Sequence, residues 1–178
     1  MGPVRTLGYP SISEAVVIRL ARAFWVCTVL GMACRGEGPA VGTSDSGFPG
    51  VQARGRAAMG VNQYTSTHLF TPLPDGGRIT LQRNRTDSAG TEQIRRHMAV
   101  IARQFALGDF HLPGFVHARD VPGTAVMAAR HGVLQYSVES LPQGAALRIR
   151  TTDPEAVAAV HAFLAFQRQD HHAGASRE

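Results

Sequence analysis

The amino-acid sequence predicts an α+β domain of two strand–strand–helix (ββα) units, whose four-stranded, mostly antiparallel sheet has two helices packed on one face. Three observations predict this class. Two pairs of short alternating segments are each joined by a turn rich in Pro and Gly, each pair is followed by a long amphipathic segment, and each amphipathic segment follows a capping residue. The chain of 178 residues is long enough for one domain with extensions, and its 44% hydrophobic content is sufficient for a core.

The first unit begins with a predicted β-hairpin. Residues 65–73 are rich in strand formers, and the turn 74–77 (PDGG) combines the fixed φ of Pro with the positive φ that Gly adopts easily. Residues 78–83 then alternate, which places Ile79 and Leu81 on one face.

A helix follows this hairpin. Asp87 or Ser88 can cap its start, and we expect it to run to about Leu107 and to end at Gly108. Its apolar residues share one face at helical spacing, and they are Ile94, Met98, Ile101, Ala102 and Phe105.

The second unit repeats this order after an irregular middle region, in which Pro113-Gly114 and Pro122-Gly123 favour at most one short helix over residues 124–130. Residues 133–140 and 147–150 alternate on either side of the turn 141–144. The repeated order of elements suggests an old duplication.

The last helix has a strong start signal. Thr152-Asp153-Pro154-Glu155 resembles a capping box with Pro in the first turn, and the helix is expected to run to about Gln169. Its apolar stripe consists of Val157, Val160, Phe163 and Leu164.

Residues 1–34 are typical of a targeting segment. Arg19 and Arg22 precede 12 uncharged residues, whereas a membrane-spanning helix needs about 20 apolar residues. Gly31 and Ala33 are the small residues expected before a cleavage site ahead of Cys34, which would become a lipidated N-terminus in a bacterial lipoprotein. A retained N-terminal anchor is the alternative, with the two arginines reaching the membrane interface.

Composition then changes along the chain. Residues 35–64 are rich in Gly, Ala and Ser without any period, and they predict a flexible tether. Residues 65–172 form the predicted domain, and residues 173–178 form a tail. Since both cysteines, Cys27 and Cys34, precede the tether, the domain has no disulfide and no thiol chemistry.

All 18 basic residues are arginine, and the formal net charge is +5. The alternation places Arg78, Arg148 and Arg150 on the sheet face opposite the helices. Single-stranded nucleic acids require aromatic side chains beside such charges, and the outward positions have none, so nucleic acid is not an expected partner. An acidic protein surface or anionic lipid headgroups fit this face better, and a merely solvated face is the alternative.

Histidine offers the main candidate chemistry. Helical spacing places His97, His161 and His171 on or beside the apolar stripes of the two helices, and His117 flanks the Pro113-Gly114 bend. These four histidines could converge if both helices lie side by side on the sheet. Neutral imidazoles suit zinc or copper, and Met98 or Met127 would add a soft ligand for Cu(I). The alternative is that these histidines lie at the edge of the core and bond to backbone carbonyls or nearby Asp residues.

No motif of a known catalytic class is present. The sequence has no nucleophile elbow, no phosphate-binding loop, no dinucleotide fingerprint and no H-E-x-x-H. We therefore expect a protein that is not an enzyme.

The second half of the chain contains a series of recognisable strings: IRRH at 94–97, FALGDF at 105–110, FVH at 115–117, PGTAVM at 122–127 and VHAFLAFQ at 160–167, followed by Asp170-His171. These strings resemble a family of short bacterial proteins that are commonly exported. The resemblance covers residues 66–174 and implies one coherent domain, without an established activity.

Together these features predict a non-enzymatic protein on the periplasmic side of the bacterial envelope. It would be attached to the membrane surface through its N-terminus, and it would serve as an extrinsic accessory subunit of a larger membrane protein complex, without a cofactor. The alternative is a periplasmic copper- or zinc-binding protein rich in His and Met.

Overall fold

The computed structural model describes residues 47–60 and 62–173. These residues form one compact unit. The helices of this unit are α1 (Phe48–Met59), α2 (Ser88–Ala106), α3 (His111–His117), α4 (Thr124–Ala129) and α5 (Pro154–Asp170), with short 3-10 turns η1 (Gln63–Thr65) and η2 (His131–Val133). The strands are β1 (Ser66–Leu73), β2 (Gly76–Arg83), β3 (Gln135–Leu141) and β4 (Gly144–Arg150).

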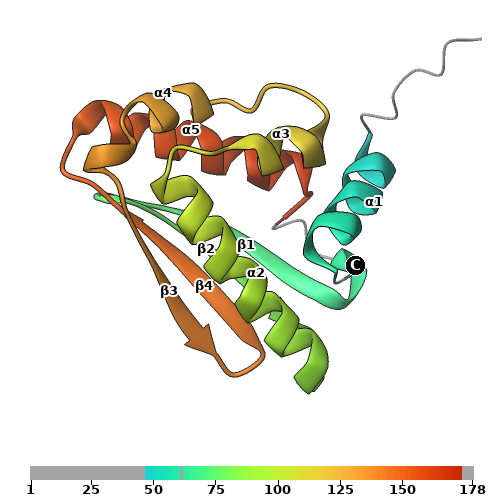
Figure 1. The fold of residues 1–178 in the computed structure, drawn as a ribbon. Coiled ribbons are helices and arrows are strands. Elements are labelled where there is room, and N and C mark those ends of the chain that lie inside the picture. The colour runs from blue at the N-terminus through green and yellow to red at the C-terminus, as the bar shows by residue number, and fades with distance from the viewer. Residues whose placement is uncertain (1–46, 61, 174–178) are drawn as a thin grey trace, which may run out of the picture. The chain divides into compact units, whose positions relative to one another are not determined.

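The four strands form one antiparallel sheet in the order β1-β2-β4-β3, which confirms the predicted α+β class and both hairpins (Figure 1). The register pairs Ile79 with Phe70 on one side and with Leu147 on the other. These apolar residues therefore form a row across the helix-covered face, as strand alternation requires.

The two long helices begin where capping residues predict. The carboxylate of Asp87 accepts a hydrogen bond from the backbone N–H of Gly90 at 3.0 Å, and that of Asp153 accepts from Ala156 at 2.8 Å. The predicted capping box is wrong in one detail, because Asp153 rather than Thr152 is the N-cap. Glu155 then lies too early to close the box, and it pairs with Arg130 instead.

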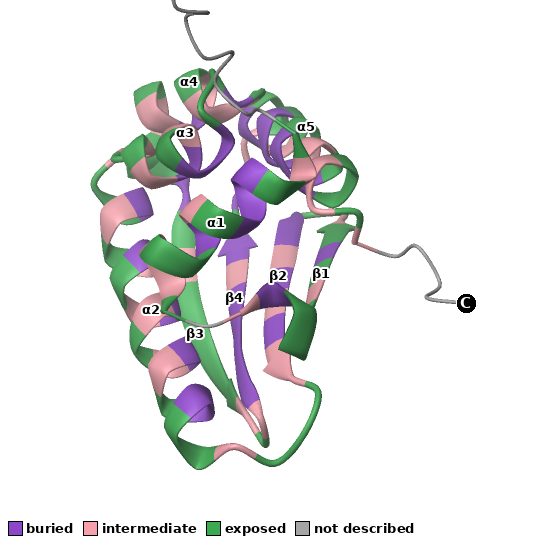
Figure 2. Cartoon of the chain, turned by 90° about the vertical axis from the view of Figure 1, so that its right-hand side faces the viewer, coloured by how far each residue is buried: buried purple, intermediate pink, exposed green. Residues whose placement is uncertain are grey.

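Each of the two long helices packs mainly on the hairpin of the other ββα unit. Helix α2 follows β2 but packs chiefly on β4 and β3, whereas α5 follows β4 but packs on β1 and β2. In Figure 2 the central strands β2 and β4 are largely buried, while β3 is mostly exposed. The core consequently lies between strands β2 and β4 on one side and helices α2 and α5 on the other.

Helix α1 corrects the predicted tether. Residues 48–59, expected to be flexible, form a helix that packs against α3, and its Val51 is fully buried. The Nε–H group of Arg54 donates to the carbonyl of Val116 at 2.8 Å, and the ring of Phe48 stacks on His172. The folded part therefore begins well before residue 65.

Helix α3 is a second correction, because the middle region was expected to contain at most the helix at 124–130. That helix exists as α4, but His111–His117 is helical as well. Pro113 occupies the third helical position, where its missing N–H has no intrahelical acceptor to lose. A Pro-Gly pair interpreted as a bend is therefore compatible with this short helix.

The remaining predictions about the N-terminus concern residues outside the described ranges. They include the targeting segment 1–34, lipidation at Cys34 and the tether before residue 47. Within the described ranges, none of the helices has the length and apolar character needed to cross a membrane.

Candidate functional site: a histidine-lined apolar cavity

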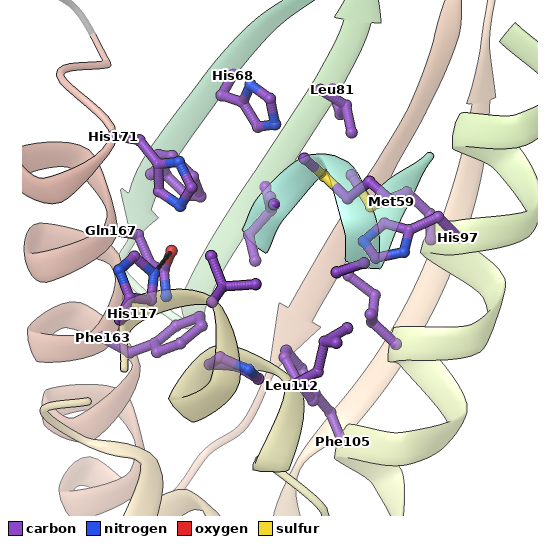
Figure 3. Close-up of a pocket in the computed structure, with 18 residues that line it drawn as sticks. Met59, His68, Leu81, His97, Phe105, Leu112, His117, Phe163, Gln167 and His171 are labelled. Atoms are coloured by element: carbon purple, nitrogen blue, oxygen red, sulfur yellow. Dashed lines mark hydrogen bonds between the residues drawn. The ribbon is translucent and has the colours of Figure 1, made fainter. Parts of the chain in front are cut away.

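A cavity of about 90 Å³ lies where α1, α2, α3 and α5 meet strands β1 and β2 (Figure 3). Most of its wall is apolar and includes Met59, Leu81, Met98, Phe105 and Phe163. Helix α1 supplies the wall farthest from the sheet, since Gly55, Ala58 and Met59 all line the cavity. The cavity thus depends on the two helices that the sequence did not predict.

Histidines supply most of the polar groups of the wall, together with Gln167. They come from four different elements: His68 from β1, His97 from α2, His117 from α3, and His171 from the end of α5. Asp, Glu, Arg, Ser, Thr and Cys are all missing from the lining formed by the described residues. The site is therefore uncharged wherever its imidazoles are neutral.

His117 is held by protein partners at both ring nitrogens. Its Nδ1–H donates to the carboxylate of Asp170, and its Nε2 lies 3.0 Å from the side-chain amide oxygen of Gln167. Arg119 pairs with the other oxygen of Asp170 and lies 4.7 Å from the ring centre of Phe166. This network fixes the orientation of His117, whose side chain is 1% exposed.

His171 and His68 form a stack next to His117, whose ring centre lies 5.0 Å from that of His171. Their ring centres lie 5.6 Å apart at an interplanar angle of 11°, and Phe70 lies 5.5 Å from His171. The side-chain amide of Gln63 donates to Nδ1 of His171 at 2.9 Å. The Nε2 atom of His68, by contrast, is buried and has no hydrogen-bond partner.

Burial sets the charge of these rings. It lowers the pKa of His68 to about 4, with the neighbouring His97 contributing, and it lowers the pKa of His97 to about 4. Burial and the nearby His68, His117 and His172 lower the pKa of His171 to about 3. All three imidazoles are therefore neutral at neutral pH.

The four histidines predicted as metal ligands do not all meet. His97, His117 and His171 line the cavity, whereas Nε2 of His161 is bonded to the carbonyl of Leu73 at 2.9 Å, outside it. Across residues 47–60 and 62–173, no group of three or more His, Cys, Asp or Glu is placed to hold a metal ion. Zinc or copper binding stays a prediction, and Cys34 lies outside the described residues.

The predicted arginine face is present, and its charges are paired. Arg78 lies beside Arg148 in the register of β2 and β4, on the face away from the helices. Arg78 pairs with Glu139 at 2.8 Å, Arg148 pairs with Asp75, and Arg150 lies 3.7 Å from the same Asp75. These carboxylates reduce the positive field that an acidic partner would meet. An interaction at this face stays a prediction.

Sequence reasoning missed His68 as a site residue. His68 precedes the inward Phe70 by two residues and is paired with the inward Leu81, so strand alternation extended to residues 66–73 would have placed it on the core face.

Comparisons with protein families, with curated proteins and with solved structures found no match to this chain.

Proposed function

We propose that this domain binds a small, uncharged, largely apolar molecule in the histidine-lined cavity. The observation that carries the proposal is the combination of an apolar wall with the buried, unpartnered Nε2 of His68. Buried polar atoms are rarely left without a hydrogen bond, and exceptions tend to mark functional positions. Ligand sites are typically apolar with a few convergent polar groups.

The chemistry of the wall favours an uncharged ligand. Placing a charge in an apolar cavity without a counter-charge is costly, and the described lining contains no Asp, Glu or Arg, while burial keeps His68, His97 and His171 neutral at neutral pH. Binding is favoured over covalent catalysis, because the same lining offers neither a hydroxyl or thiol nucleophile nor a carboxylate.

The size of the cavity favours a small ligand, of about one ring. Engineered apolar cavities of about 150 Å³ bind benzene, and the cavity here measures about 90 Å³. A monocyclic molecule would require a small outward adjustment of the wall. Helix α1 is suited to such an adjustment, because it contacts α2, α3 and η1 but has no extensive contact with the sheet.

Toluene is a suitable probe, and the full-length chain is the protein to use. Met59 and Met98 line the cavity, while Met127 is buried elsewhere in the core, so the methionine methyl signals in an NMR titration contain their own internal reference. We expect saturable shifts at Met59 and Met98, a much smaller shift at Met127, and a rise in Tm with toluene concentration.

A matched pair of variants on α1 sharpens the test. Ala58→Leu adds bulk at a residue that lines the cavity, whereas Ala57→Leu adds the same bulk one position away on the exposed side of the helix. Toluene affinity should fall at least tenfold in the first variant and stay within twofold in the second. The proposal would be refuted if toluene does not bind the native chain, or if the two variants bind toluene with equal affinity. Uptake of Zn²⁺ or Cu⁺ with loss of the histidine ring signals would favour the metal alternative instead.

A further inference from the structure

Among the described residues that line the cavity, His68 is the one with a buried side-chain nitrogen that has no hydrogen-bond partner. His117 has partners for both ring nitrogens, and His171 has Gln63 at Nδ1, but the buried Nε2 of His68 is unpartnered. A buried polar atom without a partner is destabilising, so a ligand group that reaches this atom gains a hydrogen bond without displacing a protein one.

The neutral state of His68 narrows the identity of that group. In a neutral imidazole one nitrogen is a donor and the other an acceptor, and Nε2 can be either one. A hydroxyl both donates and accepts, and it therefore satisfies Nε2 in both tautomers. A carbonyl satisfies only the donor form, and a hydrocarbon satisfies neither.

The walls around His68 favour a flat ligand. The ring of His68 is inclined by only 19° to that of Phe70 and by 11° to that of His171. Phe105 and Phe163 add aromatic surface, and Met98 adds a polarisable sulfur that makes favourable contacts with rings. Figure 3 shows His68 and His171 together on the side of the cavity opposite His97 and Met59.

We infer that the ligand class is a monocyclic phenol, whose hydroxyl hydrogen-bonds to Nε2 of His68 while its ring lies among the apolar residues of the cavity. This inference rests on the proposed binding function. The hydrogen bond to His68 would make phenols bind more tightly than other monocyclic molecules, whereas the apolar wall would contribute a similar affinity for all of them.

The test compares phenol with toluene, which differ by the exchange of a hydroxyl for a methyl group. Affinities for both are measured on the full-length chain and on His68→Phe, which keeps a flat ring but removes the nitrogens. His111→Phe is the matched control, because His111 is exposed and does not line the cavity. His68→Gln is a second variant, since its amide can again donate and accept.

We expect the ratio of phenol to toluene affinity to fall about tenfold in His68→Phe, to stay unchanged in His111→Phe, and to recover in part in His68→Gln. If toluene binds but the ratio is the same in His68→Phe as in the native chain, the inference about His68 is overturned while the binding function stands. If neither molecule binds the native chain, the binding function fails and the inference fails with it. Should His68→Phe not fold, an unchanged ratio in a folded His68→Leu protein would be equally decisive.

Discussion

The two ββα units have the same order of elements but differ in how completely their inner faces are packed. Strand β4 of the second unit places Ala145, Leu147 and Ile149 inward, and all three are fully buried. Strand β1 of the first unit places His68 and Phe70 inward, next to the cavity. Strand β4 thus presents only apolar side chains to the core at these positions, while β1 also places there a histidine whose buried Nε2 has no hydrogen-bond partner.

Because each long helix packs mainly on strands of the other unit, we expect the two units to unfold as one cooperative structure. Leu164 on α5 and Ile94 on α2 are each 0% exposed, and each helix packs mainly on strands of the other unit. We expect Leu164→Ala and Ile94→Ala each to lower the free energy of unfolding by about 2–5 kcal/mol, because each leaves a core cavity. Urea unfolding followed by circular dichroism should show one transition in both variants.

Val100→Ala is the control for these two variants, since Val100 is 40% exposed on α2 and its truncation should have little effect. Two separate transitions in either core variant would mean that the units unfold independently, and the crossed packing would then be energetically unimportant.

The contact between α5 and β2 depends on the absence of a side chain at Gly77. A Cβ at this position would lie 2.2 Å from Cδ1 of Leu164 and 3.2 Å from Cγ1 of Val160. Gly77→Ala should therefore cost about 1–3 kcal/mol of stability, as overpacking of a core does. Gly132→Ala is the matched control in the same unfolding assay, because nothing lies within 4 Å of its added Cβ. Equal stabilities of the two variants would contradict the close approach.

The histidines of the first unit predict a pH dependence of stability. The pKa values of His68 and His97 fall from the ordinary value of 6.5 to about 4 on folding because the rings are buried, so between pH 6.5 and pH 4 the unfolded chain binds more protons than the folded one. Stability should be complete above pH 6.5 and decline as the pH falls from 6.5 toward 4. The loss between pH 7 and pH 5 is on the order of 1–2 kcal/mol per buried histidine.

Urea unfolding at pH 7 and pH 5 measures this loss, and His97→Phe should reduce it by the share of one histidine. His131→Phe is the control, because His131 is exposed and its Nδ1 is bonded only to the local carbonyl of Ala128. A stability that is flat across this range would show that the buried rings are solvated more than their surroundings suggest.

The smallest change in stability is expected for residues on the sheet face opposite the helices, to which both units contribute strands. The side chains of Arg78 and Glu139 are 31% and 57% exposed, and their ion pair joins β2 of the first unit to β3 of the second. A double-mutant cycle of Arg78→Ala and Glu139→Ala should give a coupling below about 1 kcal/mol that shrinks in high salt. A larger, salt-independent coupling would mean that this pair helps to lock the units together.

The elements that could be predicted from the sequence are those with local signals. Capping carboxylates at Asp87 and Asp153, alternation in the hairpins and the apolar stripes of α2 and α5 each have a local physical cause. Helix α1 has none of these signals. It contains two internal glycines and is fixed by distant partners, namely Val116 for Arg54 and His172 for Phe48.

The candidate site was only partly predictable for the same reason. Projection of the helices identified His97 and His171, and the strings around α3 included His117, and all three lie on the cavity wall. His161 falls at the same kind of edge position on α5, yet it faces the Leu73 carbonyl instead. Periodicity can show that a histidine is near the core, but the partner it meets depends on how elements far apart in the sequence pack.

The exchange of helices between the units has a consequence for the history of the chain. The sheet order β1-β2-β4-β3 with crossed helices has the arrangement of a two-fold pair, in which each half completes its neighbour. An ancestral half-length ββα polypeptide would have left its strands uncovered as a monomer, and only two copies exchanging helices would have formed this core. The predicted duplication would then have joined two such copies in one chain, with each half still covering strands of the other.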